Sequence, residues 1–218
     1  MPAIPLQRQY GPTLGELLAP RWRRVPRTGR ALAIIAGVVL AVALAGAVAT
    51  LRHPRFAHGG PVSFSFAYPG LYRASPPTGA DALVRRTKDG RVEDSFAVAP
   101  LTLASYRGEP SGALALYAAG DIRRLAAVYP GFKLRGEGWT QLNSISPYAV
   151  YNVFFRARIE GREMYGRDVL LLPERAGARR GLAISMLTAV GANKQVDSPL
   201  LVGAKGALAA PLGSFQLG

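Results

Sequence analysis

An uninterrupted apolar run near the N-terminus constrains this chain more than any other feature. Residues 31–51 read ALAIIAGVVLAVALAGAVATL and include no charged side chain. With a helical rise of about 1.5 Å per residue, the run is long enough to cross a hydrocarbon core about 30 Å thick. A helix is also the form in which a lone segment satisfies its own backbone hydrogen bonds in lipid. The run therefore predicts a single transmembrane helix.

The charges on either side of the run predict its orientation. Residues 1–30 carry six arginines and one glutamate, a net charge of +5, whereas Arg52 and Arg55 follow the run. Cytoplasmic flanks are enriched in Lys and Arg, so we expect the N-terminus in the cytoplasm and the C-terminal part outside. The composition is typical of a GC-rich bacterial genome, which makes the plasma (inner) membrane the expected location and its lipid bilayer a partner.

A cleaved signal peptide is the competing interpretation of the same run. Ala47-Val48-Ala49 has the small-x-small pattern of a cleavage site, and cleavage after Ala49 would release the rest as a soluble extracytoplasmic protein. The apolar core of a signal peptide is typically about 7–15 residues, so the longer run favours a retained anchor. The chain has no cysteine, so the anchor must be the helix itself and not a lipid on cysteine.

The domain organisation follows from this run. We expect a basic and largely disordered cytoplasmic tail at residues 1–30, the transmembrane helix at 31–51, a linker at 52–61 and one extracytoplasmic domain at 62–218. The last range is long enough to bury a core of its own. Because cysteine is absent, that core has to hold the domain without disulfides.

Alternating apolar residues predict strands in the first part of the domain. Residues 62–68 place Val62, Phe64, Phe66 and Tyr68 on one face, and a shorter strand is expected at 71–73. The segments 82–87 and 91–98 flank Asp89-Gly90, and Asp-Gly between such runs is a hairpin signal.

A helix separates these strands from a second group. Ser111 is the expected cap, Pro130-Gly131 the stop, and the apolar stripe consists of Leu114, Ala118, Ile122, Leu125 and Tyr129. An antiparallel meander is then expected at residues 132–143, 148–159, 162–173 and 181–190. Ser198 followed by Pro199 predicts a closing helix at 200–210. The predicted class is α+β, with one transmembrane helix followed by a mainly antiparallel sheet flanked by helices.

This pattern resembles the PsbP-like α/β sandwich, which is also found in LpqN-type lipoproteins of mycobacteria. The resemblance rests on the opening FSFAYPGLYR at residues 64–73, on a helix before a long strand meander, and on a closing helix after Ser198-Pro199. It covers about residues 60–218. It implies a non-catalytic binding or accessory module and carries no shared catalytic residues to this chain.

Residue types exclude several kinds of chemistry. Without cysteine there is no thiolate nucleophile or thiolate metal site, and the two histidines, His53 and His58, both fall in the expected linker. Zinc sites and Ser-His-Asp sites need histidine held on rigid elements. No phosphate-binding fingerprint is present. We therefore expect no metal and no cofactor.

Carboxylates near the strands are interpreted as solvated charges in ion pairs. The one of most interest is Asp168, which is expected in mid-strand and facing Arg156 or Arg158 on the neighbouring strand, as cross-strand opposite charges commonly do. The others are Glu93, Asp94, Glu160 and Glu163. No catalytic residue is assigned, and the chain is not expected to be an enzyme.

The basic surface of the domain is the remaining signal for function. Residues 52–218 contain 21 Lys or Arg and 12 Asp or Glu. Anionic lipid, a cell-wall polymer or a protein could bind there, whereas nucleic acid is not expected outside the cell. The candidate binding residues are Arg85, Arg86, Arg156, Arg158, Arg179 and Arg180.

The sequence thus predicts a membrane-anchored, non-catalytic, extracytoplasmic binding or accessory domain. One alternative is an enzyme that acts on envelope lipid or glycan, which would require carboxylates about 5–10 Å apart in a cleft. The other is a structural subunit of a membrane complex, which would require an exposed apolar patch or small-residue packing along the span.

Overall fold

A computed structural model describes residues 54–140 and 148–218. These residues belong to one compact unit, His53–Gly218. The predicted tail and transmembrane helix at 31–51 lie outside the described residues. Among the residues that are described, no helix combines the length and the apolar character needed to cross a bilayer.

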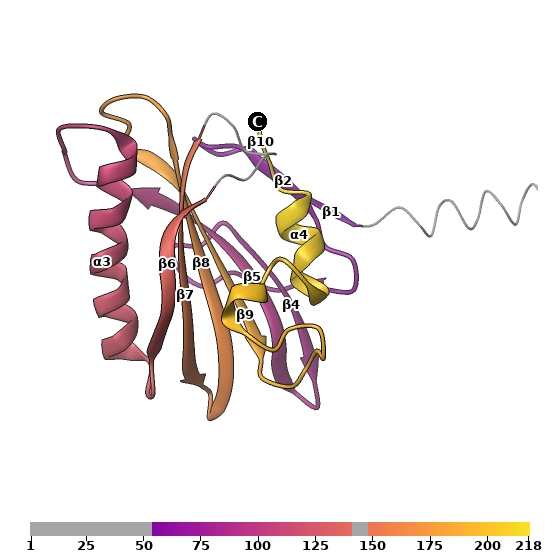
Figure 1. Ribbon diagram of the computed structural model, residues 1–218. Helices are drawn as coiled ribbons and strands as arrows, with labels where there is room; N and C mark the ends of the chain where they lie inside the picture. The colour runs from indigo at the N-terminus through magenta and orange to yellow at the C-terminus, as the bar shows by residue number, and fades with distance from the viewer. Residues whose placement is uncertain (1–53, 141–147) are drawn as a thin grey trace, which may run out of the picture. The chain divides into compact units, whose positions relative to one another are not determined.

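The centre of the unit is a seven-stranded antiparallel sheet (Figure 1). In spatial order its strands are β3 (Tyr72–Arg73), β4 (Ala82–Lys88), β5 (Arg91–Thr102), β9 (Arg180–Ala189), β8 (Arg162–Pro173), β7 (Tyr148–Ile159) and β6 (Lys133–Thr140). The predicted hairpin and meander are both confirmed. Each has a two-residue turn with positive φ at both positions, Asp89-Gly90 (51° and 73°) and Glu160-Gly161 (48° and 75°), as a type I′ turn requires.

Pairing of β5 with β9 joins the hairpin to the meander. The register runs from Asp94 opposite Thr188 to Thr102 opposite Arg180. These partners lie more than 70 positions apart along the chain, and neither strand's own sequence pattern identifies the other. The long-range pairing therefore makes a single sheet out of two locally predicted units.

Helix α3 (Pro110–Val128) packs against the β6–β7–β8 half of one sheet face (Figure 1). The predicted stripe is confirmed, because Leu114, Ala118 and Leu125 are all at most 4% exposed. The predicted cap is wrong: the helix begins two residues earlier, after Glu109, and no side chain caps it. Pro110 suits the first helical position, since proline has no N–H to leave unpaired there.

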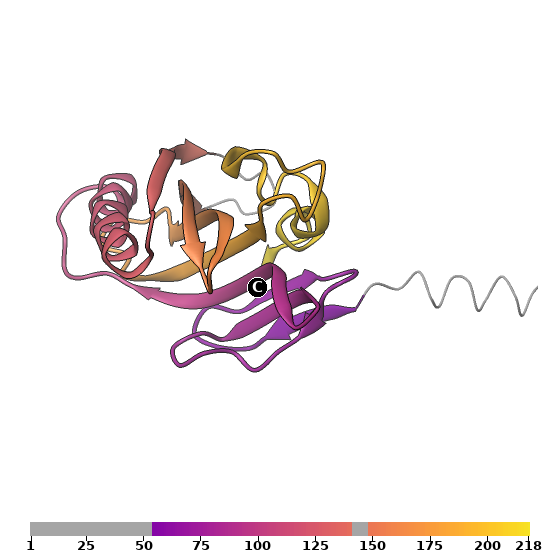
Figure 2. The same ribbon diagram turned by 90° about the horizontal axis from the view of Figure 1, so that it is seen from below.

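The opposite face is covered by a small sheet and the C-terminal segment (Figure 2). The small sheet has the order β1 (Arg55–His58), β2 (Phe64–Ala67), β10 (Gln216–Leu217). A cluster of phenylalanine rings joins it to the main sheet, with centroids 4.8–6.4 Å apart, made of Phe56, Phe64, Phe66, Phe96 and Phe215. Strand β1 lies inside the stretch expected to be a linker, yet Phe56 is buried in this core.

The predicted closing helix at 200–210 is wrong. Ser198 does accept a hydrogen bond from the Leu200 N–H (3.3 Å), but the turn that follows, η1 (Pro199–Leu201), ends after three residues. Gly203 and Gly206 have φ of 76° and 73°, which a right-handed helix does not allow. Only η2 (Gly206–Leu208) and the short α4 (Ala209–Gly213) follow. The predicted class, an α+β sandwich with a mainly antiparallel sheet, is confirmed for the domain.

Candidate functional site

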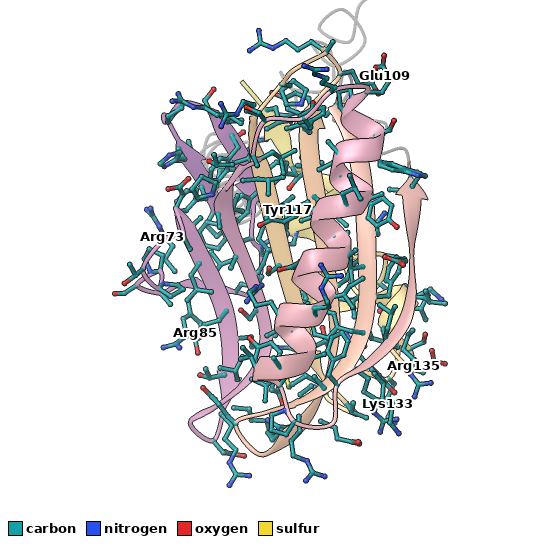
Figure 3. The ribbon with its side chains drawn as sticks, turned by 90° about the vertical axis from the view of Figure 1, so that its left-hand side faces the viewer. Arg73, Arg85, Glu109, Tyr117, Lys133 and Arg135 are labelled. Atoms are coloured by element: carbon teal, nitrogen blue, oxygen red, sulfur yellow. The ribbon has the colours of Figure 1, made fainter. Side chains whose placement is uncertain are left out.

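Among residues 54–140 and 148–218, α3 contacts β6, β7 and β8, and no helix covers the half of this sheet face formed by β5 and β9. Figure 3 shows α3 over one side of the sheet, with Tyr117 on the helix flank that faces the uncovered strands. On this face the exposed side chains of β5 and β9 are mostly small. The alternate residues of the same strands, such as Phe96 and Ile184, point to the other face and are buried in the opposite core. We call this surface the open strip; it consists of Ser95, Ala97, Ala99, Ala183, Ser185 and Leu187, all half-buried or exposed.

A cavity lies at each end of the open strip. The Tyr117 cavity, about 270 Å³, is formed between the loop after β5 and the start of α3, with Leu116 and Tyr117 in its wall. The Leu187 cavity, about 170 Å³, lies at the other end, where Ser95 and Leu187 of the strip meet Ile159 and Met164. Both linings are mainly apolar. The strip and the Leu187 cavity share Ser95 and Leu187, whereas the Tyr117 cavity lies beyond the other end of β5. Together they are the candidate binding surface along one flank of α3.

A pair of carboxyl groups lies under the edge of α3 next to the strip. Asp168 on β8 is 5% exposed, and its carboxyl interacts with the Asp121 carboxyl of α3 and with Ser185 of the strip. Asp121 also accepts a hydrogen bond from Arg124 at 2.6 Å. Two carboxyl groups in hydrogen-bonding contact share a proton more readily than they carry two charges. Asp121 of the helix and Asp168 of the sheet therefore favour a state in which one of the two is protonated.

Burial raises the pKa of Asp168 to about 7, and the charge of Asp121 adds to the rise. The hydrogen bond from Ser185 and the charge of Arg124 act in the opposite direction. The pKa of Tyr117, on the same flank of α3, is also raised, mainly by burial. Asp168 therefore changes its charge close to neutral pH.

The expected pairing of Asp168 with Arg156 or Arg158 is wrong. Asp168 lies opposite Val153 in the β7–β8 register, and its side chain points toward α3. Arg156 and Arg158 lie at alternate positions of β7 and point to the other face, where Arg156 forms an ion pair with Glu163. The sequence placed Asp168 in the right strand but could not show that an α3 carboxyl would cover it.

The remaining predicted carboxylates do not form a catalytic pair with Asp168. Asp94 is buried on the opposite sheet face, bonded to Thr188 (3.0 Å) and Arg86 (2.5 Å), and burial raises its pKa. Glu93 also contacts Arg86, at 3.4 Å. The carboxyls that do meet, Asp121 and Asp168, are in direct contact beneath a helix and not 5–10 Å apart across a cleft.

The six predicted binding arginines lie in three separate places. Arg85 and Arg86 are adjacent on β4 and alternate between the two faces, and Figure 3 shows Arg85 at the outer edge of the sheet. Arg156 and Arg158 lie on β7, while Arg179 and Arg180 lie at the start of β9. Arg86 and Arg156 are engaged in ion pairs, and Arg179 donates to the Leu103 carbonyl (3.2 Å). The six do not form one site.

Different basic residues come together at the turns of the two hairpins. Arg91 and Arg162 both line the Leu187 cavity and a more polar cavity of about 550 Å³, which we call the hairpin cavity. Lys88 lines the hairpin cavity as well. The pattern of arginines near each turn was visible in the sequence, but only the β5–β9–β8 register shows that the two turns lie at the same end of the sheet.

Two further polar features have structural partners. Arg167 is buried, and its guanidinium donates to the Asn152 side chain and to the Val202 carbonyl, at 3.0 Å each; burial lowers its pKa to about 10. His58 belongs to β1, not to a linker, with its Nε2 3.6 Å from Asp81. Within residues 54–140 and 148–218 no group of three or more His, Asp or Glu is placed to hold a metal.

Comparison with known proteins gives weak structural similarity. No family model matches the chain, and no curated protein matches it in sequence. The structure of LpqN, involved in cell envelope biogenesis of Mycobacterium tuberculosis, aligns over 79% of this chain and 95% of its own, with 13% identity and a TM-score of 0.49.

Two other solved structures are also similar. A Pseudomonas aeruginosa protein of unknown function aligns over 59% of this chain and 83% of its own, with 19% identity and a TM-score of 0.34. A Bacteroides thetaiotaomicron protein aligns over 76% of this chain and 48% of its own, with 12% identity and a TM-score of 0.40. LpqN is thus a weak structural neighbour of this chain.

Proposed function

We propose that this chain is a non-catalytic binding module, anchored in the membrane, that holds a ligand with an apolar body along the open strip beside α3. The observation that carries the proposal is a sheet face left uncovered over β5 and β9 with a mainly apolar cavity at each end. Ligand sites are typically concave, mostly apolar and provided with a few polar groups.

The burial pattern supports this use of the strip. On the half covered by α3, same-face residues such as Val153 and Leu170 are at most 1% exposed, whereas Leu116 and Tyr117 on the open flank are 76% and 36% exposed. Large apolar side chains beside a small-residue surface leave room for a ligand and offer it contact area. An apolar body in the strip would remove these side chains from water, which is favourable.

Dye binding tests the proposal on the fragment 53–218, which contains both cores. We expect the neutral apolar dye Nile red to bind the fragment, with a rise in fluorescence. Ser185→Trp places a large ring in the middle of the strip and should weaken binding about tenfold, which corresponds to about 1.4 kcal/mol. Ser185 is exposed, so the new ring is accommodated at the surface, although the contact of Ser185 with Asp168 is lost.

Ala127→Trp is the matched control, because Ala127 lies on α3 but is exposed outside the strip. Its dye affinity should equal that of the unchanged fragment. Equal affinity of the Ser185→Trp and Ala127→Trp fragments, or no binding by the unchanged fragment, would contradict the proposal.

A second candidate function is acid–base catalysis on a ligand in the strip. The Asp121–Asp168 pair favours it, since a carboxyl group that titrates near neutral pH can both donate and accept a proton. Asp168 itself is buried and meets the strip through Ser185. A turnover that Asp168→Asn abolishes and Ser185→Ala reduces would favour this candidate over simple binding.

A further inference from the structure

The two basic hairpin turns converge although they lie about 70 residues apart in the sequence. Arg91 begins β5 and Arg162 begins β8, and both strands pair with β9, which places their starts at the same end of the sheet. Arg162 reaches across the end of β9 and donates a hydrogen bond to the Val92 carbonyl of β5 (3.3 Å). The two arginines are therefore held near each other by the main sheet.

The cations at this end lack carboxylate partners. Within the described part of the chain, no carboxylate oxygen lies within 4.0 Å of the charged atoms of Lys88, Arg91 or Arg162. The carboxylates that line the same cavities are Asp89, Glu93 and Glu160, and Glu93 is paired with Arg86. Like charges held close together repel, so an anion between them would be favourable.

The cavities around these cations differ in character. The hairpin cavity is mainly polar, with Lys88, Asp89 and Glu93 in its wall. The Leu187 cavity is mainly apolar, with Ile159, Met164 and Leu187 in its wall. Arg91 and Arg162 belong to both. A ligand with one anionic group and an apolar body matches this arrangement, with the charge at the arginines and the apolar body toward the open strip.

We propose that Arg91 and Arg162, assisted by Lys88, bind the phosphate or carboxylate group of an amphiphile whose apolar part occupies the Leu187 cavity and the open strip. This inference rests on the proposed function and names the class of ligand. The planar guanidinium group pairs with such oxyanions through two parallel hydrogen bonds, which favours arginine at such a site. None of these three residues is among the six that the sequence singled out.

The methionines provide a direct readout in the full chain. Met164 lines the Leu187 cavity, whereas Met186 is fully buried in the opposite core. We would label methionine methyl groups with ¹³C, place the full chain in phosphatidylcholine nanodiscs, and titrate with hexyl phosphate, hexanol and inorganic phosphate. The Met164 signal should shift while Met186 stays constant, and hexyl phosphate should bind about tenfold more tightly than hexanol.

Arg91→Gln and Arg162→Gln should each reduce hexyl phosphate affinity to about that of hexanol and leave hexanol affinity unchanged. Arg91 is exposed, and within the described residues its side chain makes no hydrogen bond, so the Arg91 variant should fold. This holds even if the Arg162 variant, which loses the hydrogen bond to Val92, has a weaker sheet. The matched control is Arg158→Gln, which removes an exposed arginine from β7 and should bind hexyl phosphate normally.

Other outcomes separate the two proposals. Equal affinity for hexyl phosphate and hexanol would overturn the anion site and leave the apolar strip intact. Inorganic phosphate that binds as tightly as hexyl phosphate would identify a free-phosphate site and overturn the amphiphile. Absence of any Met164 shift would overturn both the anion site and binding in the Leu187 cavity, and loss of affinity in Arg158→Gln alone would place the anion elsewhere.

Discussion

Single residues show how burial changes the meaning of a charge. Asp168 has an ordinary sequence context for an ion pair, with several arginines close by. In the structure it faces another carboxyl, Asp121, and Arg124 supplies a nearby positive charge. The side chain of Arg124 is 61% exposed, so water screens its charge. Burial therefore dominates, and Asp168 keeps its proton to about pH 7.

The raised pKa of Asp168 makes the free energy of unfolding depend on pH. The pKa of Asp168 is about 7 in the folded protein and near 3.8 in an unfolded chain. Between these values the folded protein holds a proton that the unfolded chain has released. The contribution of Asp168 to the free energy of unfolding should therefore be largest below about pH 4 and should fall as the pH rises toward about 7.

Asp168→Asn should remove this pH dependence, because the amide resembles the protonated acid and still donates a hydrogen bond to Asp121. At pH 8 we expect the variant to be more stable than the unchanged protein by about 1–3 kcal/mol. Urea unfolding of both at pH 5 and pH 8 measures the difference. Asp197→Asn, at an exposed position, is the control, and a variant of Asp168 that is less stable at pH 8 would disprove the shared proton.

At the scale of elements, the strands and α3 follow from local patterns, whereas the C-terminal segment does not. The apolar stripe of α3 and the alternation in β7 each bury the face that the pattern indicates. Between Ser198 and Gly213 the composition favours a helix, but close packing against the main sheet imposes positive φ at Gly203 and Gly206. Tertiary contacts there override local propensity, which is a weak effect per residue.

Gly203→Ala should therefore be strongly destabilising, although alanine is the better helix former. A Cβ at Gly203 would lie 2.8 Å from both Leu212 and Met186, at a φ of +76°. We expect the free energy of unfolding to fall by about 1–3 kcal/mol. A Cβ at Gly213 meets nothing within 4 Å, so Gly213→Ala should leave the urea midpoint unchanged or slightly higher. Equal midpoints for the two variants would contradict this account.

At the scale of the whole molecule, the two ends of the domain are joined. Strand β10 pairs with β2, and Phe215 is fully buried against the phenylalanine rings of β2 and β5. Strand β1 begins at Arg55, only four positions after the apolar run ends at Leu51. In the proposed anchored protein, the tether between run and domain would be at most three residues, about 10 Å of extended chain.

The proposed anchor predicts the behaviour of the intact protein in cells. The full chain should remain in the membrane fraction after washing with carbonate at high pH, whereas fragment 53–218 should be released. Protease added to spheroplasts should digest the C-terminal domain and spare an N-terminal tag. Digestion that occurs only from the cytoplasmic side would reverse the orientation, and an intact mass that begins at Thr50 would favour the cleaved signal peptide.

The sequence by itself determined the local elements, because alternation, a helical stripe and two-residue turns depend on residues that are neighbours along the chain. It indicated the main antiparallel sheet, α3 and the α+β class, and it placed arginines near both hairpin turns. Only the tertiary structure decided that β5 pairs with β9, that Asp121 covers Asp168, and that Arg91 and Arg162 meet. Each of these depends on contacts between distant segments, which the burial of two separate cores selects.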